Sequence, residues 1–167
     1  TSNKITAAML YDMVQCPHRP TMDLFGDSEL RDEANPFIQL LWEKGTTFEH
    51  EVIDRYKATI VDLSSSTGED KEQLTRDAML RGEPLIYSGR ISFDDLMGEP
   101  DLLRKEGDGY VAGDIKSGSG QEGHDEKAKL KRHYGVQLSL YTDILERQGF
   151  ATSRRPFIWD ICGEEVI

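Results

Sequence analysis

The chain has 167 residues, of which 37% are apolar and 31% charged, so it is long enough to bury one hydrophobic core. This composition excludes a disordered chain, and neither a membrane-spanning apolar run nor a signal peptide is visible. The formal net charge of −11 argues against a protein that coats nucleic acid, but a nuclease stays possible because metal-binding carboxylates add negative charge. We expect a single domain over residues 1–167, either the whole protein or a fragment of a longer one.

The first half of the chain predicts helices around one short strand. A short helix is expected over 5–15, and the prolines that follow it at 17 and 20 should stop it. A longer helix is predicted over 36–57, where apolar residues recur at three- and four-residue spacing. A strand over 59–63 and a polar helix over 69–81, with Leu74 on its inner stripe, come next.

The second half predicts strands that lead into a long helix. Strands are expected over 84–93, 99–104 and 109–116, and the turn-rich residues between the last two predict a hairpin. A Gly-rich loop then precedes a helix over 125–148, with a break near Gly135, and the last strand is predicted over 156–162. This succession of helices and strands indicates an α/β domain.

Acidic residues and one lysine occupy the predicted hairpin. Charge in such apolar segments is costly without a partner or a metal, which draws attention to Asp101, Asp114 and Lys116. Asp114 and Lys116 are two residues apart and therefore share one face of a strand. If the hairpin forms, Asp101 and Asp114 reach one site, to which the Ile115 carbonyl could add a third oxygen. Such a donor set suits Mg²⁺ or Mn²⁺, and Lys116 could orient a water or stabilise charge on a phosphate.

Two helices carry polar residues that could complete this site. Gly45 and Glu49 are four residues apart on the helix over 36–57, so a small residue and a carboxylate share one face. Gln137 and Tyr141 have the same spacing on the late helix, where an amide and a phenol could contact a phosphate or position the lysine.

Each of these residues also has an ordinary structural explanation. Asp101 could be a turn residue, Asp114 and Lys116 could form an ion pair at a sheet edge, and Glu49 could pair on a solvated helix face. Tyr141 could be a core residue. We favour a functional site because five such coincidences would be needed together.

These motifs resemble, in order and spacing, the RecB-like branch of the PD-(D/E)XK nuclease superfamily, a branch related to CRISPR-associated exonucleases. The motifs are Gly45-x-x-x-Glu49, Gly98-Glu99-Pro100-Asp101, Asp114-Ile115-Lys116 and Gln137-x-x-x-Tyr141. The resemblance implies a restriction-endonuclease-like core, in which α-helices flank a mixed central β-sheet. It also implies Mg²⁺- or Mn²⁺-dependent hydrolysis of phosphodiester bonds in DNA.

The resemblance assigns a role to each motif residue. It implies that Asp101, Asp114 and the Ile115 carbonyl are metal ligands and that Lys116 is the catalytic lysine. Glu49 takes a further acidic position at the metal, and Gln137 and Tyr141 lie near the DNA. The implied protein is an exonuclease acting on DNA ends or single strands in repair, recombination or defence, with a helicase domain or subunit as a possible partner. The alternative is a non-catalytic DNA-binding module of a helicase–nuclease machine, and a hydrolase of small phosphates is weaker because it would not explain the Gln137-x-x-x-Tyr141 helix.

The cysteines depart from the pattern of many relatives. Those relatives hold an iron–sulfur cluster through one early and three late cysteines, whereas this chain has only Cys16 early and Cys162 late. Because a cubane cluster needs four thiolates, we expect no iron–sulfur cluster from this chain alone. We expect Cys16 to be buried as a small apolar residue, and the absence of a disulfide framework favours a reducing, cytoplasmic compartment.

Overall fold

A mixed β-sheet forms the centre of the computed structural model, which describes residues 4–33, 35–122, 129–161 and 165–166. Within these ranges six strands pair, in the order β11 (Glu165–Val166), β10 (Phe157–Trp159), β7 (Gly109–Ile115), β6 (Leu102–Glu106), β3 (Leu85–Tyr87) and β2 (Ile60–Asp62). The pairs β10–β7 and β2–β3 are parallel, and the other neighbours are antiparallel.

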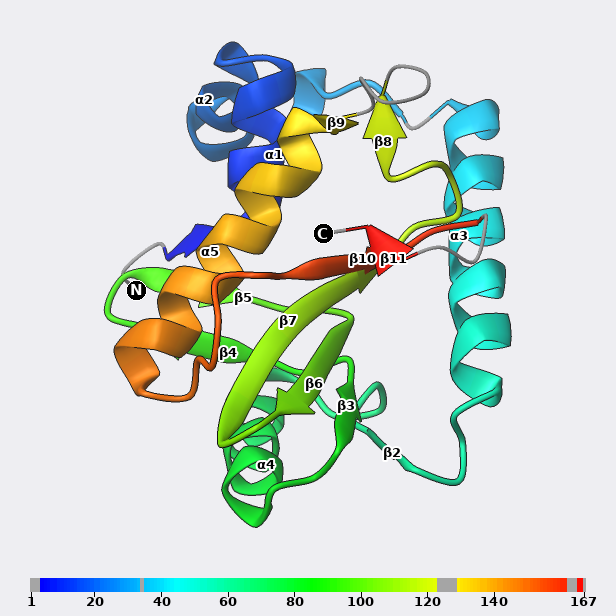
Figure 1. Ribbon diagram of the computed structural model, residues 1–167. Coiled ribbons are helices and arrows are strands. Elements are labelled where there is room, and N and C mark those ends of the chain that lie inside the picture. Colours follow the sequence, from blue (N-terminus) through cyan, green and yellow to red (C-terminus); the bar gives the residue numbers. More distant parts are fainter. Residues whose placement is uncertain (1–3, 34, 123–128, 162–164, 167) are drawn as a thin grey trace.

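Helices cover both faces of this sheet (Figure 1). Residues of β7 alternate between two hydrophobic clusters, as the two-residue period of a strand requires. Ala112 belongs to the cluster with α4 (Gly68–Arg81) and α5 (Arg132–Gln148), whereas Val111 and Ile115 belong to the cluster with the end of α3 (Pro36–Asp54). This arrangement confirms the predicted α/β architecture, with a restriction-endonuclease-like mixed sheet between helices.

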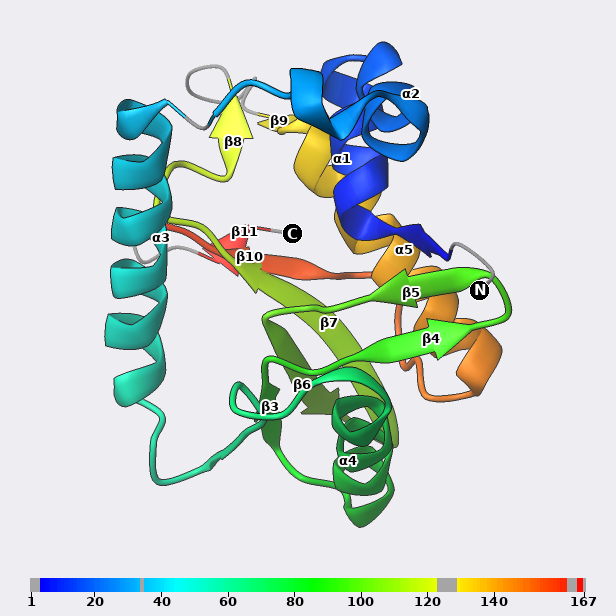
Figure 2. The ribbon, with the colours of Figure 1, turned by 180° about the vertical axis from the view of Figure 1, so that it is seen from behind.

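A smaller sheet and the first helices lie beside α5 (Figure 2). Its strands are β1 (Ile5–Thr6), β5 (Leu96–Gly98) and β4 (Ile91–Phe93). Helix α1 (Ala7–Gln15) packs along α5 and is followed by α2 (His18–Phe25) and a 3₁₀ turn (Ser28–Leu30). A short antiparallel pair, β8 (Gln121–Glu122) and β9 (Lys129–Leu130), comes between β7 and α5 in the chain. In the part of the chain that the structure describes, no helix has both the length and the apolar composition to cross a membrane.

The predicted hairpin is present, but its first strand covers Leu102–Glu106 instead of 99–104, so Asp101 precedes β6. The strand expected over 84–93 is divided. β3 ends before Ser88, whose φ of 56° turns the chain, so β3 and β4 belong to different sheets. β5 occupies 96–98, between two of the predicted strands, because its backbone pairs with both β4 and the distant β1. Asp94, with a φ of 50°, makes the turn between β4 and β5.

Several helix predictions also need correction. The helix predicted over 5–15 ends at Gln15, as expected, but its first two residues form β1. A second helix, α2, then follows, with Pro20 in its first turn, where no backbone N–H is needed. α5 begins at Arg132 and runs through Gly135 without a break, while residues 125–128 lie outside the described ranges. Leu74 is exposed on α4, and Cys16 is exposed rather than buried. Cys162 lies outside the described residues.

Candidate active site

The β6–β7 hairpin brings three charged side chains together at one end of the sheet. Leu102 pairs with Gly113, so the next step of the register places Asp101 beside Asp114. Asp101 Oδ2 accepts a hydrogen bond of 2.7 Å from the Ile115 N–H. Lys116 Nζ lies 3.2 Å from Asp114 Oδ2 and 3.9 Å from Asp101 Oδ2. The structure thus brings together the carboxylates and the lysine that the sequence predicted to share a site.

One ammonium group must balance two carboxylates in this partly buried place. Burial raises the pKa of Asp101, and the charge of Asp114 raises it further, to about 8, although Lys116 and the Ile115 N–H act in the opposite direction. Burial alone would lower the pKa of Lys116, but Asp114 and Asp101 together hold it above its ordinary value. A proton on Asp101 near neutral pH indicates that the site lacks positive charge, which a cation would supply.

The donor set fits a hard divalent cation. Asp114 Oδ2 is buried and forms an ion pair with Lys116 Nζ at 3.2 Å. A carboxylate oxygen can accept more than one partner, so this oxygen has capacity for a cation. The Ile115 side chain packs in the cluster with α3, so only its backbone could contribute. Among the described residues, no group of three or more His, Cys, Asp or Glu side chains is arranged to hold a metal ion. Two carboxylates suffice for Mg²⁺, because this ion keeps several of its waters.

Glu49 lies on α3, the helix that packs on the Ile115 face of the sheet, and its charge reaches Asp101. Its carboxylate contributes to the raised pKa of Asp101. It also accepts a hydrogen bond from Tyr87, whose pKa is raised first by burial and then by Glu49. The structure therefore places Glu49 near the predicted site but engages it with a phenol of β3. Gly45, one turn earlier, faces Ser117 Oγ with room for a methyl group, so close packing does not explain this glycine.

Gln137 and Tyr141 lie on the α5 side of the site and contact the loop that carries Asp101. The Tyr141 ring is buried, and its hydroxyl donates to the Glu99 carbonyl at 3.4 Å. A Cβ on Gly98 would lie 2.5 Å from this ring, so only glycine allows the approach. Gln137 Oε1 is buried without a hydrogen-bond partner, and both side chains line a cavity of about 370 Å³ with Gly98 and Glu99.

Two contacts near the site were not foreseen from the sequence. The Tyr134 ring centre lies 5.4 Å from Lys116 Nζ, a cation–π contact that no motif predicts. Lys71 of α4 is only 7% exposed and lies behind the loop of Asp101. Its spacing from the buried Thr75 and Ala78 places it on the inner face of α4, so helical periodicity could have found it.

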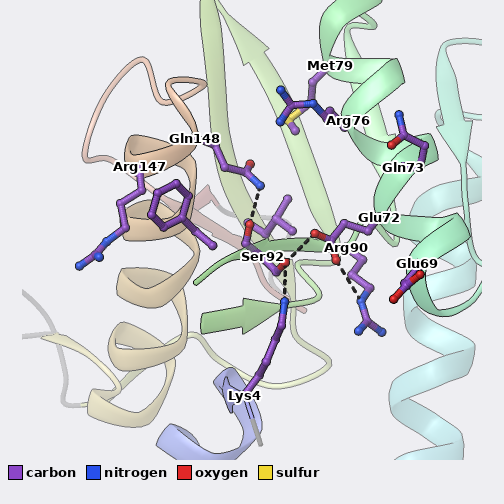
Figure 3. Close-up of a pocket in the computed structure, with 12 residues that line it drawn as sticks. Lys4, Glu69, Glu72, Gln73, Arg76, Met79, Arg90, Ser92, Arg147 and Gln148 are labelled. Atoms are coloured by element: carbon purple, nitrogen blue, oxygen red, sulfur yellow. Dashed lines mark hydrogen bonds and ion pairs between the residues drawn. The ribbon is translucent and has the colours of Figure 1, made fainter. Parts of the chain in front are cut away.

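A cavity of about 640 Å³ lies away from this site, between α4, β4 and the end of α5 (Figure 3). Its polar groups bind one another. Ser92 accepts a hydrogen bond from Lys4 at 2.8 Å and donates one to Glu72 at 2.5 Å, and Gln148 donates to the Ser92 carbonyl at 2.9 Å. The paired carboxylates Asp101 and Asp114 lie elsewhere, at the end of the β6–β7 hairpin, which is therefore the candidate active site.

Comparison with known proteins identifies the family of this chain. A search among curated proteins finds no match. The family model described as the PD-(D/E)XK nuclease superfamily matches residues 25–165, a range that contains the hairpin and both helices of the site. Members of this superfamily act on nucleic acid with divalent metal ions, typically Mg²⁺. The chain belongs to the PD-(D/E)XK nuclease superfamily, a family of metal-dependent nucleases.

Proposed function

We propose that this protein is a Mg²⁺- or Mn²⁺-dependent deoxyribonuclease of the RecB-like branch, an exonuclease that acts on DNA ends or single strands. The observation that carries the proposal is the contact of Asp101, Asp114 and Lys116 at the end of the β6–β7 hairpin. The proposed domain covers residues 1–167.

Asp101 and Asp114 would hold the cation, and the Ile115 carbonyl would be a neutral third ligand. Glu49, on α3, would be a further acidic residue at the metal. When bound, a divalent cation activates a water for attack and neutralises charge on the phosphate. The burial of Asp114 Oδ2, which shares the Lys116 ammonium with Asp101, and the raised pKa of Asp101 both favour this role, because each indicates missing positive charge. Cation binding would displace the proton from Asp101.

Lys116 would act as a fixed positive charge rather than as a base. Its raised pKa keeps the ammonium protonated at neutral pH, so it cannot accept a proton from water. The ammonium can instead stabilise the charge that develops on the phosphate oxygens and can orient the attacking water. Asp114 at 3.2 Å fixes its position on one side, and the Tyr134 ring contacts it as well.

Nucleic acid would approach along the start of α5. Lys131 Nζ lies 5.6 Å from the centre of the Tyr134 ring that also contacts Lys116, so positive charge continues outward from the catalytic lysine. Such charge offsets the overall acidity of the chain where a phosphate backbone must bind. Gln137, whose side chain lines a cavity with Gly98 and Glu99, would contact the substrate, and Tyr141 would support the neighbouring loop through the Glu99 carbonyl.

The biological setting follows from the same resemblance. We place the enzyme in DNA repair, recombination or defence, in the reducing cytoplasm, with a helicase domain or subunit as its partner. The four thiolates of a cubane cluster are not all present in this chain, so the proposed cofactor is the divalent cation alone.

Labelled linear and circular single-stranded DNA test the exonuclease proposal. We expect Mn²⁺-dependent loss of the linear strand, little change in the circle, and no activity in Lys116→Met. Asp108→Asn is the matched control, since Asp108 is an exposed acid in the turn of the same hairpin. Equal cutting of the circle would refute exonuclease action, and full activity of Lys116→Met would refute the proposed site.

The alternative function is a non-catalytic DNA-binding module. It is favoured by one observation, the absence among the described residues of a three-ligand group arranged for a metal ion. Calorimetric titration with Mn²⁺ separates the two. Binding that disappears in Asp101→Ala supports the enzyme, and no binding to the wild-type protein supports the module.

A further inference from the structure

A buried lysine lies behind the loop that carries Asp101. Lys71, on α4, is 7% exposed and donates a hydrogen bond of 2.9 Å from Nζ to Ser88 Oγ. The same Nζ lies 3.8 Å from Glu99 Oε2. A lysine is buried at a cost unless charged or polar partners surround it, so these contacts hold the ammonium in one place.

Each partner of Lys71 is joined directly to the Asp101 loop. Ser88 has a φ of 56°, and its backbone N–H donates a 2.8 Å hydrogen bond to the Asp101 carbonyl. Glu99 stands two residues before Asp101 in the same loop. One ammonium group therefore holds both the turn that binds the Asp101 main chain and a side chain of the loop itself.

Helix α4 fixes this turn at a second point. Thr75, one helical turn after Lys71, accepts a hydrogen bond of 2.9 Å from the Arg90 N–H and donates one of 2.7 Å to the Lys71 carbonyl. Arg90 then reaches Glu99 Oε1 with Nη1 at 3.3 Å. Arg90 also borders the cavity of Figure 3, where it faces Glu72. Glu99 is thus held between two cations that α4 positions.

We propose that Lys71 is a positioning residue for the metal site: through Ser88 and Glu99 it holds the loop that presents Asp101 beside Asp114. This inference rests on the proposed function of that site, because it explains how one of its ligands is oriented. Lys71 and Ser88 are outside the motifs that define the site, whereas Glu99 belongs to the motif that ends at Asp101. Among the described residues, Lys71 makes its hydrogen bond and ion pair with Ser88 and Glu99. Partners behind a metal ligand commonly change metal affinity by about ten- to a hundredfold when removed.

Amide hydrogen exchange of the metal-free protein tests the inference without any activity. The Ile115 N–H donates to Asp101 Oδ2, so its protection reports where the Asp101 side chain lies. In Lys71→Met we expect this amide to exchange about tenfold faster, as loss of a hydrogen bond to a charged group predicts, while the Val111 amide of the same strand stays protected. Lys57→Met, which removes an exposed lysine of a surface ion pair, is the matched control.

Calorimetry with Mn²⁺ provides the second readout. We expect Lys71→Met to bind Mn²⁺ about ten- to a hundredfold more weakly than wild type and Lys57→Met to bind normally. Unchanged Ile115 exchange and unchanged Mn²⁺ affinity in Lys71→Met would overturn the inference. If Lys71→Met fails to fold, Glu99→Gln replaces it, because the Glu99 side chain is 47% exposed and the two side chains have the same shape. Wild-type exchange of the Ile115 amide in Glu99→Gln would then overturn the inference. Absence of Mn²⁺ binding in the wild-type protein would instead refute the proposed function, and the exchange experiment still decides the role of Lys71.

Discussion

Raising the pH from 6 to 8 should strengthen the binding of Mn²⁺ to this protein by about fiftyfold. The reason is the proton on Asp101, whose pKa is raised to about 8 first by burial and then by the charge of Asp114. At pH 6 almost every Asp101 carries a proton that the cation must displace, whereas at pH 8 about half are ionised. The ratio of these ionised fractions gives the expected change in affinity.

Calorimetry in buffers with different ionisation enthalpies measures both the affinity and the protons released. At pH 7 we expect about 0.9 proton to leave for each cation bound. Asp101→Asn should bind Mn²⁺ more weakly and without this proton release. Equal affinity at pH 6 and pH 8, with no proton released, would show that Asp101 does not titrate as the geometry requires and would refute the reasoning.

The same proton affects the stability of the metal-free protein. The pKa of Asp101 rises from 3.8 in the unfolded chain to about 8 in the folded protein. Between these two pH values the native state keeps a proton on Asp101 that the unfolded state has already released. The contribution of Asp101 to stability therefore falls as the pH rises through the window, by a few kcal/mol at most, since the side chain is 24% exposed. Denaturation in urea at several pH values should show this decrease, and saturating Mn²⁺ at pH 8 should reverse it.

Three substitutions extend these expectations. Lys116→Met should lower the rate of DNA cleavage by about a hundred- to a thousandfold in a single-turnover assay, while Mn²⁺ still binds. Loss of Mn²⁺ binding together with cleavage would contradict a purely electrostatic role for Lys116. Gly98→Ala should destabilise the protein by about 1–3 kcal/mol in urea denaturation, because its Cβ would lie 2.5 Å from the Tyr141 ring. Gly118→Ala, whose Cβ meets nothing within 4 Å, is its control, and equal stability of the two variants would argue against that contact. Gln137→Ala should weaken the binding of labelled DNA in fluorescence anisotropy at an unchanged melting temperature, and unchanged affinity would remove Gln137 from the substrate site.

The hairpin that carries the site could be predicted because its signals are local. Asp114 and Lys116 share a face through the two-residue period of a strand, and the turn at Gly107 and Asp108 sets the register that brings Asp101 alongside. Glu49 and Tyr141 lie near the Asp101 loop, Glu49 through its effect on the pKa of Asp101 and Tyr141 through the Glu99 carbonyl. Their engagement with Tyr87 and with the Glu99 carbonyl could not be predicted, because these partners are distant in sequence.

Other features depend on tertiary contacts that no local pattern encodes. β5 is a strand because it pairs with β1, 91 residues away in sequence, although its own residues indicate a turn. Ser88 adopts a positive φ where the residues around it predict a continuous strand, and its contacts with Lys71 and Asp101 accompany this turn. Lys71 shares the inner face of α4 with Thr75 and Ala78, but its partners Ser88 and Glu99 come from other segments and could not be predicted.

The central claim is that Asp101, Asp114 and Lys116 form a metal-dependent nuclease site. Cleavage of end-labelled single-stranded DNA by the purified protein tests it most directly, with and without Mn²⁺, for wild type, Asp114→Asn and the control Asp108→Asn. We predict that wild type and Asp108→Asn cleave the strand only with Mn²⁺ and that Asp114→Asn does not cleave it. Cleavage by Asp114→Asn at the wild-type rate, or no cleavage by the wild-type protein, would contradict the claim.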